Sequence, residues 1–595
     1  MTNISSRLSA LREVMREEHL AAFIFPSTDP HQGEYVPAHW ESRKWISGFD
    51  GSAGTAVVTM KKAALWTDSR YFIAAEEQLC GTEFQLMKER IEGTPSIAEW
   101  LSEVLQEDSS STEVGIDGMC CAASMVEKLI EELRKNGGFT IRTNFDPMQR
   151  VWTGRPSIPQ HPVEIQPLEY AGETATEKLA RIRRELREQH IDGMLVSALD
   201  DIAWTLNLRG GDVHCNPVFV SYLLIASDRA TLFVDEKKLS ATVKGYLKVM
   251  GVSTDEYHKV GQGLRDYFEY NILLDPDETN YTLMHAVDKK RVARQKSPIP
   301  SMKVVKNEAE IKGFRNAMLR DGIAMTKFLC WLDRTIGTEP ITELTISDKL
   351  YALRSEQPLF RNISFDTIAA YQEHGAIVHY EPTAESDVAL KPEGLLLVDS
   401  GAQYQDGTTD ITRTIALGPV TAEQKRVYTL VLKGHIQLEM LKFPVGASGT
   451  QLDALARKDM WAAGMNFLHG TGHGVGSYLN VHEGPHQIRM EYRPEPLRAG
   501  MTVTDEPGIY LEGRFGVRIE NTLLITPYMK TEFGEFLQFE SLTLCPIDVR
   551  PVDVDMLTKE ERQWLNDYHR RVYEVLSPYL NNEEKVWLGN DTKPI

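Results

Sequence analysis

Two pairs of acidic residues fall in segments that have the pattern of β-hairpins. Residues 395–417 read LLLVDSGAQYQDGTTDITRTIAL, an apolar run that ends in Asp399 followed by a β-branched run that carries Asp410. A symmetric hairpin would place these carboxylates directly opposite each other, with Cβ atoms about 5 Å apart. The turn signal Asp406-Gly407 lies off its centre and leaves the register open. Carboxylates this close repel each other unless a cation lies between them or one is protonated.

A second hairpin is predicted over residues 501–525, MTVTDEPGIYLEGRFGVRIENTLLI, with its midpoint at Gly513. Glu506 and Glu520 each lie seven residues from that midpoint, so this hairpin also brings two carboxylates face to face. Arg518 precedes Glu520 by two residues and therefore points to the same face of the strand.

Between the hairpins, residues 469–485 read HGTGHGVGSYLNVHEGP. Glycines at alternate positions from 470 to 476 leave one face of a predicted strand without side chains, which permits close approach of another group. A single histidine here would more often be a packed structural residue. Three of them between two acidic hairpins, His469, His473 and His482, favour a functional site.

Four carboxylates and at least one imidazole are the ligand set of a two-metal hydrolytic site, with ions about 3.5 to 4 Å apart. The six cysteines are scattered without a CxxC pair, so oxygen and imidazole would hold the metal, which favours manganese, zinc, cobalt or iron. No Walker A, GxSxG or helical HExxH pattern occurs in the chain. The sequence therefore favours metal-assisted hydrolysis.

The composition is typical of a globular protein with several domains: 595 residues, 42 % hydrophobic and 25 % charged. The 65 Lys and Arg against 85 Asp and Glu give a formal net charge of −20, which opposes binding to nucleic acid and to anionic membranes. There is no run of 18 apolar residues, and the N-terminus predicts a charged amphipathic helix without a signal-peptide core. We therefore expect a cytoplasmic protein without nucleic-acid or membrane partners.

Proline-rich segments and helix-capping residues predict where the domains divide. Two proline-rich segments, residues 153–162 and 297–300, predict linkers. After the second, Asn307 with Glu310 three residues later predicts a capping box at the start of a helix and of a new domain. Near the C-terminus, Thr558 and Glu561 predict the start of a docking helix in the same way; its apolar stripe comprises Trp564, Leu565, Tyr568, Val572 and Leu576.

The part of the chain before the new domain reads as two copies of one unit. LREVMREEHLAAFIF at 11–25 matches IRRELREQHIDGMLV at 182–196 with an offset of 171, and each predicts a helix that leads into a strand. Farther along, AALWTDSRYF at 63–72 matches ATLFVDEKKL at 230–239 with an offset of 167. Duplication is the interpretation that we adopt.

The acidic and histidine residues resemble, in order and approximate spacing, the five metal ligands of the pita-bread metallopeptidases, which include methionine aminopeptidase, prolidase and aminopeptidase P: Asp399, Asp410, His473, Glu506 and Glu520. Longer phrases resemble the three-domain cytosolic Xaa-Pro aminopeptidases: GFDGSAGT at 48–55, AIVHY at 376–380, DSGAQYQDGTTDITRT at 399–414, the histidine segment at 469–485 and TDEPGIY at 504–510. The resemblance runs nearly from end to end, with no departure at a ligand position.

The resemblance implies a role for each ligand and a metal. His473 would be the terminal imidazole ligand, Asp399 a chelating ligand, Asp410 and Glu520 the bridging carboxylates, and Glu506 a ligand close enough to shuttle a proton. The cofactor implied is two divalent metal ions, most often Mn²⁺.

The resemblance also assigns residues that contact or orient the substrate. His379, His469 and His482 would line the substrate site, and Arg518 would lie behind the ligands. The reaction implied is release of the N-terminal residue from peptides with proline in the second position, by attack of a dimetal-bridged hydroxide on the carbonyl before proline. His482 is our first choice for stabilising the oxyanion. A homodimer is implied as well.

The fold class implied is α/β and α+β multidomain, with two creatinase-like N-terminal α/β domains, a C-terminal pita-bread catalytic domain and a helical tail. We expect these domains at residues 1–155, 156–305, 306–545 and 546–595, the second being a repeat of the first. The two leading domains carry no complete catalytic set, so we expect them to limit access to short N-termini rather than to form a second active site.

Two other functions stay open. The first keeps the fold but changes the hydrolysis, as in prolidase, which takes only dipeptides, or creatinase, which uses no metal. The second is a non-catalytic pita-bread binding protein. The complete ligand set argues against creatinase and against a binding protein, and the three-domain length argues against prolidase.

Overall fold

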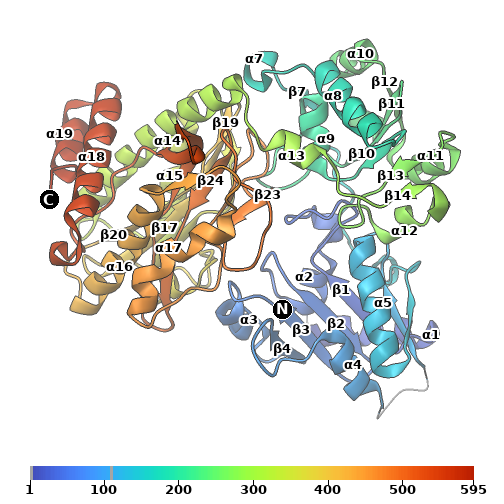
Figure 1. Ribbon diagram of the computed structural model, residues 1–595. Coiled ribbons are helices and arrows are strands. Elements are labelled where there is room, and N and C mark those ends of the chain that lie inside the picture. The colour runs from blue at the N-terminus through green and yellow to red at the C-terminus, as the bar shows by residue number, and fades with distance from the viewer. Residues whose placement is uncertain (1–3, 107–110) are drawn as a thin grey trace. The chain divides into compact units, whose positions relative to one another are not determined.

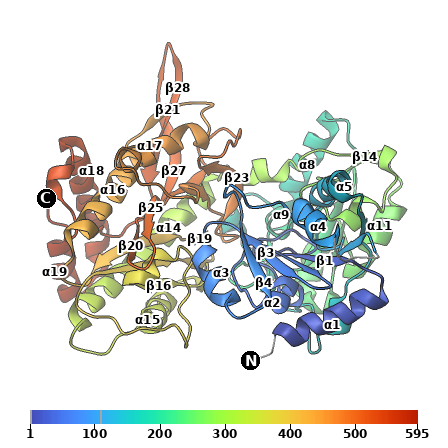
Figure 2. The ribbon, with the colours of Figure 1, turned by 90° about the horizontal axis from the view of Figure 1, so that it is seen from below.

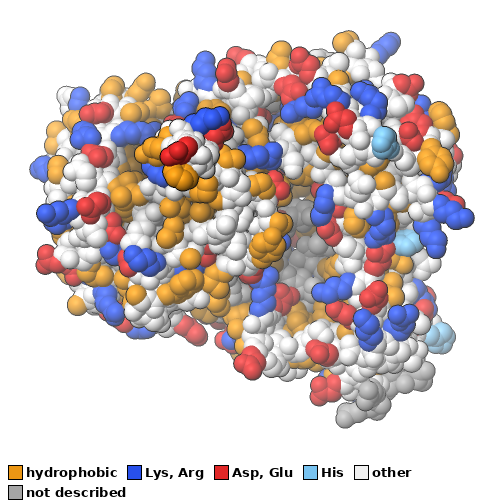
Figure 3. Space-filling model, viewed as in Figure 1, with side chains coloured by type: hydrophobic (Ala, Val, Ile, Leu, Met, Phe, Trp, Pro, Cys, Tyr) orange, Lys and Arg blue, Asp and Glu red, His pale blue; other side chains and the backbone are white. Residues whose placement is uncertain are grey.

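The computed structural model describes residues 4–106 and 111–595 and divides into two compact units. Unit 1 comprises Met1–Gln166 and Glu173–Ile299, and unit 2 comprises Pro167–Gly172 and Pro300–Ile595. In the part of the chain that the structure describes, no helix has the length and apolar character needed to cross a membrane. On the face shown in Figure 3, basic and acidic side chains are interspersed over both units.

The first domain of unit 1 is a six-stranded sheet with the order β4-β3-β2-β1-β5-β6. Side chains of β1 alternate between two cores: Ala22 and Ile24 pack with α4 and α5, whereas Phe23 and Phe25 pack with α1, α2 and α3. The sheet is therefore covered by helices on both faces (Figure 1). Its elements are α1 (Ile4–Glu17), β1 (Ala22–Pro26), α2 (Ser42–Ser47), β2 (Thr55–Thr59), β3 (Ala63–Thr67), α3 (Phe72–Leu79), β4 (Phe84–Lys88), α4 (Ile97–Gln106), β5 (Glu113–Ile116), α5 (Ala123–Gly137), β6 (Thr140–Arg142) and α6 (Met148–Val151).

The second domain of unit 1 has a sheet of the order β12-β11-β10-β8-β13-β14. Its helix α8 buries Leu179, Ile182 and Leu186. Helices α11 and α12 share a hydrophobic core with β8, β10, β11 and β13. Its elements are β7 (Glu164–Ile165), α8 (Ala175–Glu188), β8 (Met194–Val196), α9 (Leu199–Leu206), β9 (Leu208–Arg209), β10 (Ser221–Ile225), β11 (Ala230–Val234), α10 (Ala241–Val249), β12 (Val252–Asp255), α11 (Val260–Asp266), β13 (Ile272–Leu273), α12 (Tyr281–Met284) and β14 (Val292–Ala293).

The two sheets of unit 1 have the same strand order and the same strand directions. In each, the first strand pairs antiparallel with the second and parallel with the fifth, and the third and fourth pair parallel. His19 and His190, which are 171 residues apart, both have a φ of 58° where the first helix turns into the first strand. These shared features agree with the predicted internal repeat.

The predicted linkers differ in structure. No helix or strand is assigned to residues 153–162, as expected. In the second segment, the division between the two units falls between Ile299 and Pro300, and a short helix, α13 (Ile299–Lys303), begins at that point. Proline is tolerated in the first turn of a helix because that turn's N–H groups have no partner within the helix.

Unit 2 consists of several small sheets covered by paired helices (Figure 1). Helices α14 and α15 pack on β16, β17 and β20, and α17 packs on β24, β27 and β28. The outer part of the β27–β28 hairpin projects beyond these helices (Figure 2). The elements are α7 (Leu168–Ala171), α14 (Glu308–Thr335), α15 (Glu343–Ser355), β15 (Phe360–Ile363), β16 (Ile368–Tyr371), β17 (Leu395–Ser400), β18 (Ala402–Tyr404), β19 (Gly407–Thr408), β20 (Ile411–Ala416), α16 (Ala422–Glu439), β21 (Lys442–Pro444), α17 (Gly449–Ala462), β22 (Gly472–Gly474), β23 (Glu483–Ile488), β24 (Thr502–Asp505), β25 (Gly508–Leu511), β26 (Phe515–Arg518), β27 (Asn521–Thr531), β28 (Gly534–Ser541), α18 (Lys559–Leu576) and α19 (Asn582–Asp591).

Both predicted capping boxes of unit 2 are present. The side chain of Asn307 accepts from Glu310 N at the start of α14, and that of Thr558 accepts from Glu561 N at the start of α18. Four of the five predicted stripe residues of α18 are buried: Leu565, Tyr568, Val572 and Leu576. Helix α18 contributes to the same core as α16, so it docks on unit 2 as expected.

Candidate metal centre

The first acidic hairpin has a different register from the symmetric one. Strand β17 pairs with β20 so that Asp399 lies opposite Thr412, and Asp410 precedes β20 by one residue. The register that the sequence left open is therefore not the symmetric one, and Asp399 does not pair directly with Asp410. Tyr404 pairs with Gly407 in the β18–β19 turn, which centres the hairpin one residue later than the symmetric arrangement.

The second acidic hairpin has the predicted centre. Asp505 pairs with Asn521 and Gly508 pairs with Arg518, so both ladders are symmetric about Gly513, where φ is +67°. The two predicted glutamates, Glu506 and Glu520, lie at equivalent positions between these ladders.

The glycines between the hairpins permit close packing of the backbone. A Cβ atom added to Gly472 would lie 1.9 Å from the carbonyl oxygen of Thr504, and one added to Gly474 would lie 2.4 Å from that of Glu483. The predicted absence of side chains on this face is thus required at both positions. Strand β22 is shorter than the segment predicted, because only residues 472–474 pair with β23.

These elements bring one histidine and three carboxylates together. His473 Nε2 is 3.4 Å from Asp410 Oδ2 and 3.6 Å from Glu506 Oε1. One ligand atom from each of Asp410, His473 and Glu520 lies within 4.8 Å of the others. Nδ1 of His473 is 2.8 Å from the carbonyl oxygen of Gly474, which leaves Nε2 directed at the carboxylates.

Asp399 joins this group through an arginine. Its Oδ2 accepts a hydrogen bond of 2.6 Å from Arg518 Nη2, while its buried Oδ1 has no hydrogen-bond partner. Burial raises the pKa of Asp399, Arg518 opposes this change, and the charge of Asp410 adds to it.

The electrostatics of this group fit divalent cations. Burial, and to a smaller extent the charges of Asp410 and Asp399, raises the pKa of Glu506 to about 7. Burial and the other carboxylates raise the pKa of Glu520 well above its usual range. Burial opposes charge on His473, but its contacts with Asp410 and Glu506 raise its pKa to about 9. Positive charge at this position would therefore stabilise several carboxylates at once.

The remaining predicted residues lie around this centre to different degrees. The ring of His482 is 4.4 Å from that of His473, centroid to centroid. His469 Nε2 is 2.8 Å from the hydroxyl of Tyr510, which accepts a hydrogen bond of 2.8 Å from Arg518 Nη1. His379 is half-buried between β16 and β17, and its place in the site stays a prediction.

Two residues of the site were missed in the sequence. Tyr510 connects His469 with Arg518, and no pattern marks it because its role depends on a contact 41 residues away in the chain. Thr412 donates a hydrogen bond of 2.7 Å to Glu520 Oε2. The position of Thr412 two residues after Asp410 was an available signal, since such residues share one strand face.

Comparisons with known proteins agree with this architecture. The family model for metallopeptidase family M24 matches residues 312–527, and its C-terminal region matches residues 535–595. Two creatinase/prolidase N-terminal domain models match residues 7–143 and 154–310.

Relatives match the chain over its whole length. Aminopeptidase P1 of Arabidopsis thaliana is 38 % identical over 100 % of this chain and 99 % of its own. Xaa-Pro aminopeptidase 1 of Dictyostelium discoideum is 39 % identical over 100 % of this chain and 97 % of its own. The solved X-prolyl aminopeptidase of Caenorhabditis elegans, described as a cytosolic enzyme with a di-nuclear active site, has a TM-score of 0.95 and 35 % identity over 100 % of both chains.

The predicted fold class is confirmed: two creatinase-like N-terminal domains precede an M24 catalytic domain. Identity of 38 % and 39 % over the length of this chain shows that it shares a family with these relatives, and the two acidic hairpins and His473 agree with that family. The chain belongs to metallopeptidase family M24, among the Xaa-Pro aminopeptidases.

Proposed function

We infer that this protein releases the N-terminal residue from peptides with proline in the second position. The observation that carries this proposal is the close grouping of Asp410, His473, Glu506 and Glu520 in a chain that matches Xaa-Pro aminopeptidases from end to end. An Xaa-Pro bond has no N–H through which an enzyme could hold the scissile amide. Its leaving nitrogen, like that of any peptide bond, must receive a proton from the enzyme or from water.

In this proposal, two divalent ions, most often Mn²⁺ in this family, are held by Asp399, Asp410, His473, Glu506 and Glu520. The donor set of carboxylate oxygens and one imidazole suits such ions. The raised pKa of Glu506 and Glu520 and the unpartnered Oδ1 of Asp399 support the fit. Bound there, the ions would acidify a water molecule and polarise the carbonyl group before proline.

The residues of the chain have distinct tasks in this proposal. Glu506 would be the group that accepts a proton from water and delivers it to the proline nitrogen; its Oε1 lies 3.6 Å from Nε2 of His473, within the proposed ligand group. His482, whose ring lies 4.4 Å from that of His473, would donate a hydrogen bond to the carbonyl oxygen as it gains charge. The connection from His469 through Tyr510 to Arg518 holds Asp399 in one orientation.

The experiment that tests this function is a comparison of three substrates. We expect the Mn²⁺-loaded protein to cleave an Xaa-Pro-Xaa tripeptide at its first bond, with the products identified by mass spectrometry. Cleavage of an Xaa-Pro dipeptide alone would identify a prolidase-type dipeptidase. Turnover of creatine alone would identify a creatinase, and no turnover of any substrate would favour a binding protein.

Two accessory properties rest on the same likeness. The homodimer is a proposal that sedimentation equilibrium of the purified protein tests directly. A cytoplasmic location is supported by the description of the Caenorhabditis elegans relative as a cytosolic enzyme.

A further inference from the structure

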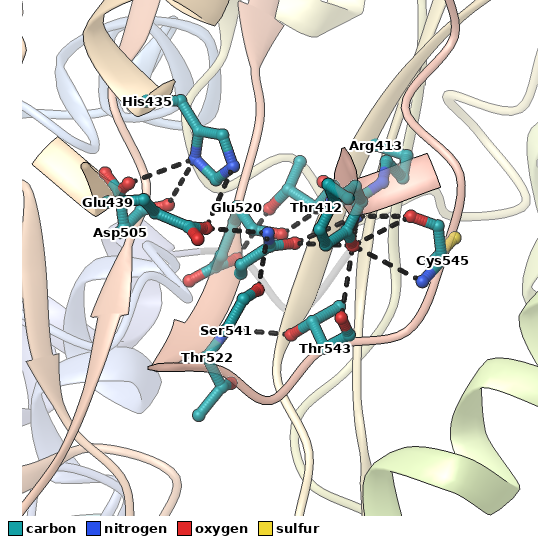
Figure 4. Close-up of polar contacts among 12 residues, drawn as sticks. Thr412, Arg413, His435, Glu439, Asp505, Glu520, Thr522, Ser541, Thr543 and Cys545 are labelled. Atoms are coloured by element: carbon teal, nitrogen blue, oxygen red, sulfur yellow. Dashed lines mark hydrogen bonds and ion pairs between the residues drawn. The ribbon is translucent and has the colours of Figure 1, made fainter. Parts of the chain in front are cut away.

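A second group of potential metal ligands lies in unit 2, outside the site described above. It comprises His435 and Glu439 from the last turns of α16 and Asp505 from the end of β24. Each has one ligand atom within 4.8 Å of the others. Asp505 precedes Glu506, so its side chain projects from the opposite face of the strand. Figure 4 shows the His435 ring directed toward the two carboxylates.

The three side chains are almost completely enclosed by protein. The exposed fraction is 0 % for His435, 5 % for Glu439 and 0 % for Asp505. Neither carboxylate oxygen of Asp505 has a hydrogen-bond partner, and neither has Nε2 of His435. Leaving such groups buried without partners is unfavourable, so their arrangement calls for a further ligand.

One separation fits two donors that share one ion. His435 Nε2 is 3.3 Å from Glu439 Oε1, yet this contact forms no hydrogen bond. Two donors that are each about 2.1 Å from an ion lie about 3.0 Å apart at a right angle and about 3.4 Å apart at the tetrahedral angle. The measured value falls in that interval. The third residue, Asp505, has a carboxylate oxygen within 4.8 Å of the ligand atoms of the other two.

His435 repeats the environment of His473. Nδ1 of His435 is 3.3 Å from the carbonyl oxygen of Asp505, just as Nδ1 of His473 is 2.8 Å from that of Gly474. In both residues Nε2 then faces a carboxylate, at 3.3 Å from Glu439 and at 3.4 Å from Asp410. A main-chain contact at Nδ1 that orients Nε2 is the usual arrangement of a metal-binding histidine.

Two neighbours favour a cation here. Glu439 Oε1 accepts a hydrogen bond of 2.8 Å from Asn521 Nδ2, which fixes the carboxylate in place as outer contacts of metal ligands commonly do. Glu439 is also the last residue of α16, and the carbonyl end of a helix stabilises positive charge. Burial lowers the pKa of His435 to about 4, so the ring is neutral at physiological pH and can act as a ligand.

We propose that His435, Glu439 and Asp505 bind a third divalent cation, of the class that prefers imidazole and carboxylate ligands, such as Mn²⁺ or Zn²⁺. The ion ties the end of α16 to the end of β24, and β24 leads directly into Glu506. We assign the ion a structural role, because its three proposed ligands are buried and are therefore not accessible to a substrate.

The test counts metal ions in the full-length protein. Chelated protein is reloaded with Mn²⁺, or in parallel with Zn²⁺, and the bound metal is measured by mass spectrometry after removal of the excess. We expect Glu439→Gln to hold one ion per chain fewer than the unaltered protein. The matched control is Glu561→Gln, which removes another buried carboxylate that contacts α16 through Lys433 and belongs to neither cluster. It should hold the same number as the unaltered protein.

A second variant separates this site from the candidate catalytic metals. Asp410→Asn should lose metal at the catalytic centre and still lose one further ion when Glu439→Gln is added. Equal metal contents with and without Glu439→Gln would overturn the proposal and would indicate that the three groups share protons instead. The failure of the proposed peptidase activity would not affect this count.

Diffraction decides the matter if Glu439→Gln does not fold. Crystals of the unaltered protein grown with Mn²⁺ are measured on both sides of the manganese absorption edge. We expect an anomalous peak between His435 Nε2, Glu439 and Asp505. A map that shows peaks at His473 and none at His435 overturns the proposal.

Discussion

The positive charge of Arg518 offsets the negative charge of Asp399 in the metal centre. The guanidinium of Arg518 is buried, and it contacts Asp399 and the hydroxyl of Tyr510. It therefore compensates one carboxylate of the centre, whereas Asp410, Glu506 and Glu520 depend on His473 and on the proposed ions. Changes to single ligands should consequently affect metal binding more than folding.

Replacing Asp410 by Asn tests its proposed bridging role. The amide retains the size of the side chain but removes a charge within 3.4 Å of His473. We expect markedly less Mn²⁺ per chain by elemental analysis and loss of peptidase activity, because a bridging ligand contributes to both ions. Asp406→Asn, in the same hairpin, should leave the metal content unchanged. An Asp410→Asn protein with full metal content would exclude the assignment.

His482→Ala tests the contribution of a transition-state donor. We expect normal metal content and a fall in kcat of at least about 100-fold, the usual scale for loss of one such hydrogen bond. KM and kcat are measured on an Xaa-Pro-Xaa peptide. A variant with unaltered kcat would show that His482 only packs against His473.

The titrating groups predict how the metal-free protein responds to pH. The pKa of Glu506 rises from 4.5 to about 7 and that of His473 from 6.5 to about 9 on folding. At these two residues the folded state binds more protons than the unfolded state between about pH 4.5 and 9, so their contribution to stability falls as pH rises through that window. We expect the difference in Tm between the chelated protein and chelated Glu506→Gln to shift against the unaltered protein from pH 5 to 9. An equal dependence of Tm on pH in the two proteins would contradict the raised pKa of Glu506.

At the scale of elements, Arg413 of β20 joins three segments of the chain. The side chain is 1 % exposed and donates to the carbonyl oxygens of Glu520 and Cys545 and to the hydroxyl of Tyr568 on α18. The C-terminal helix is thereby linked to the strands that carry the acidic residues. The carbonyl of Glu520 is fixed at 2.7 Å from Arg413 Nη1.

Arg413→Met should accordingly destabilise unit 2. Several buried acceptors lose their donor, and we expect a fall in the free energy of unfolding of at least about 3 kcal/mol, measured by urea denaturation. Arg315→Met removes an exposed arginine that pairs with Glu540 and should cost less than about 1 kcal/mol. Similar losses in the two variants would refute the anchoring role of Arg413.

The two acidic hairpins show which features a sequence determines by itself. The second was predicted correctly because its residues are symmetric about Gly513, and local turn geometry is sufficient to set the register. The register of the first stayed open because its strand leaves one sheet at Gly401 and enters another. A Cβ on Gly401 would lie 2.2 Å from Ser364 Oγ, a contact from a distant segment that no local pattern reveals.

The same distinction applies to the candidate site. Asp410, His473, Glu506 and Glu520 were identified because their residue types and order carry the chemistry. Tyr510 was missed because its contacts with His469 and Arg518 arise only when three segments pack together.

At the scale of the molecule, each unit has its own hydrophobic cores. The proposed metals bind only unit 2, and a ligand stabilises the unit to which it binds. We expect calorimetry of the full chain to show two transitions, with chelation lowering the temperature of one of them. A single transition that shifts as a whole would show that the units unfold together.

The short segment Pro167–Gly172 has a consequence for the order in which the protein is made. It belongs to unit 2 although the chain on both sides belongs to unit 1, and Asn307 at the start of α14 donates a hydrogen bond of 2.9 Å to the carbonyl oxygen of Ala171. On the ribosome this segment is synthesised well before its partner helix. Unit 1 ends at Ile299, so its synthesis can be complete before α14 has been made. At that stage of synthesis, α7 lacks its contact with the start of α14.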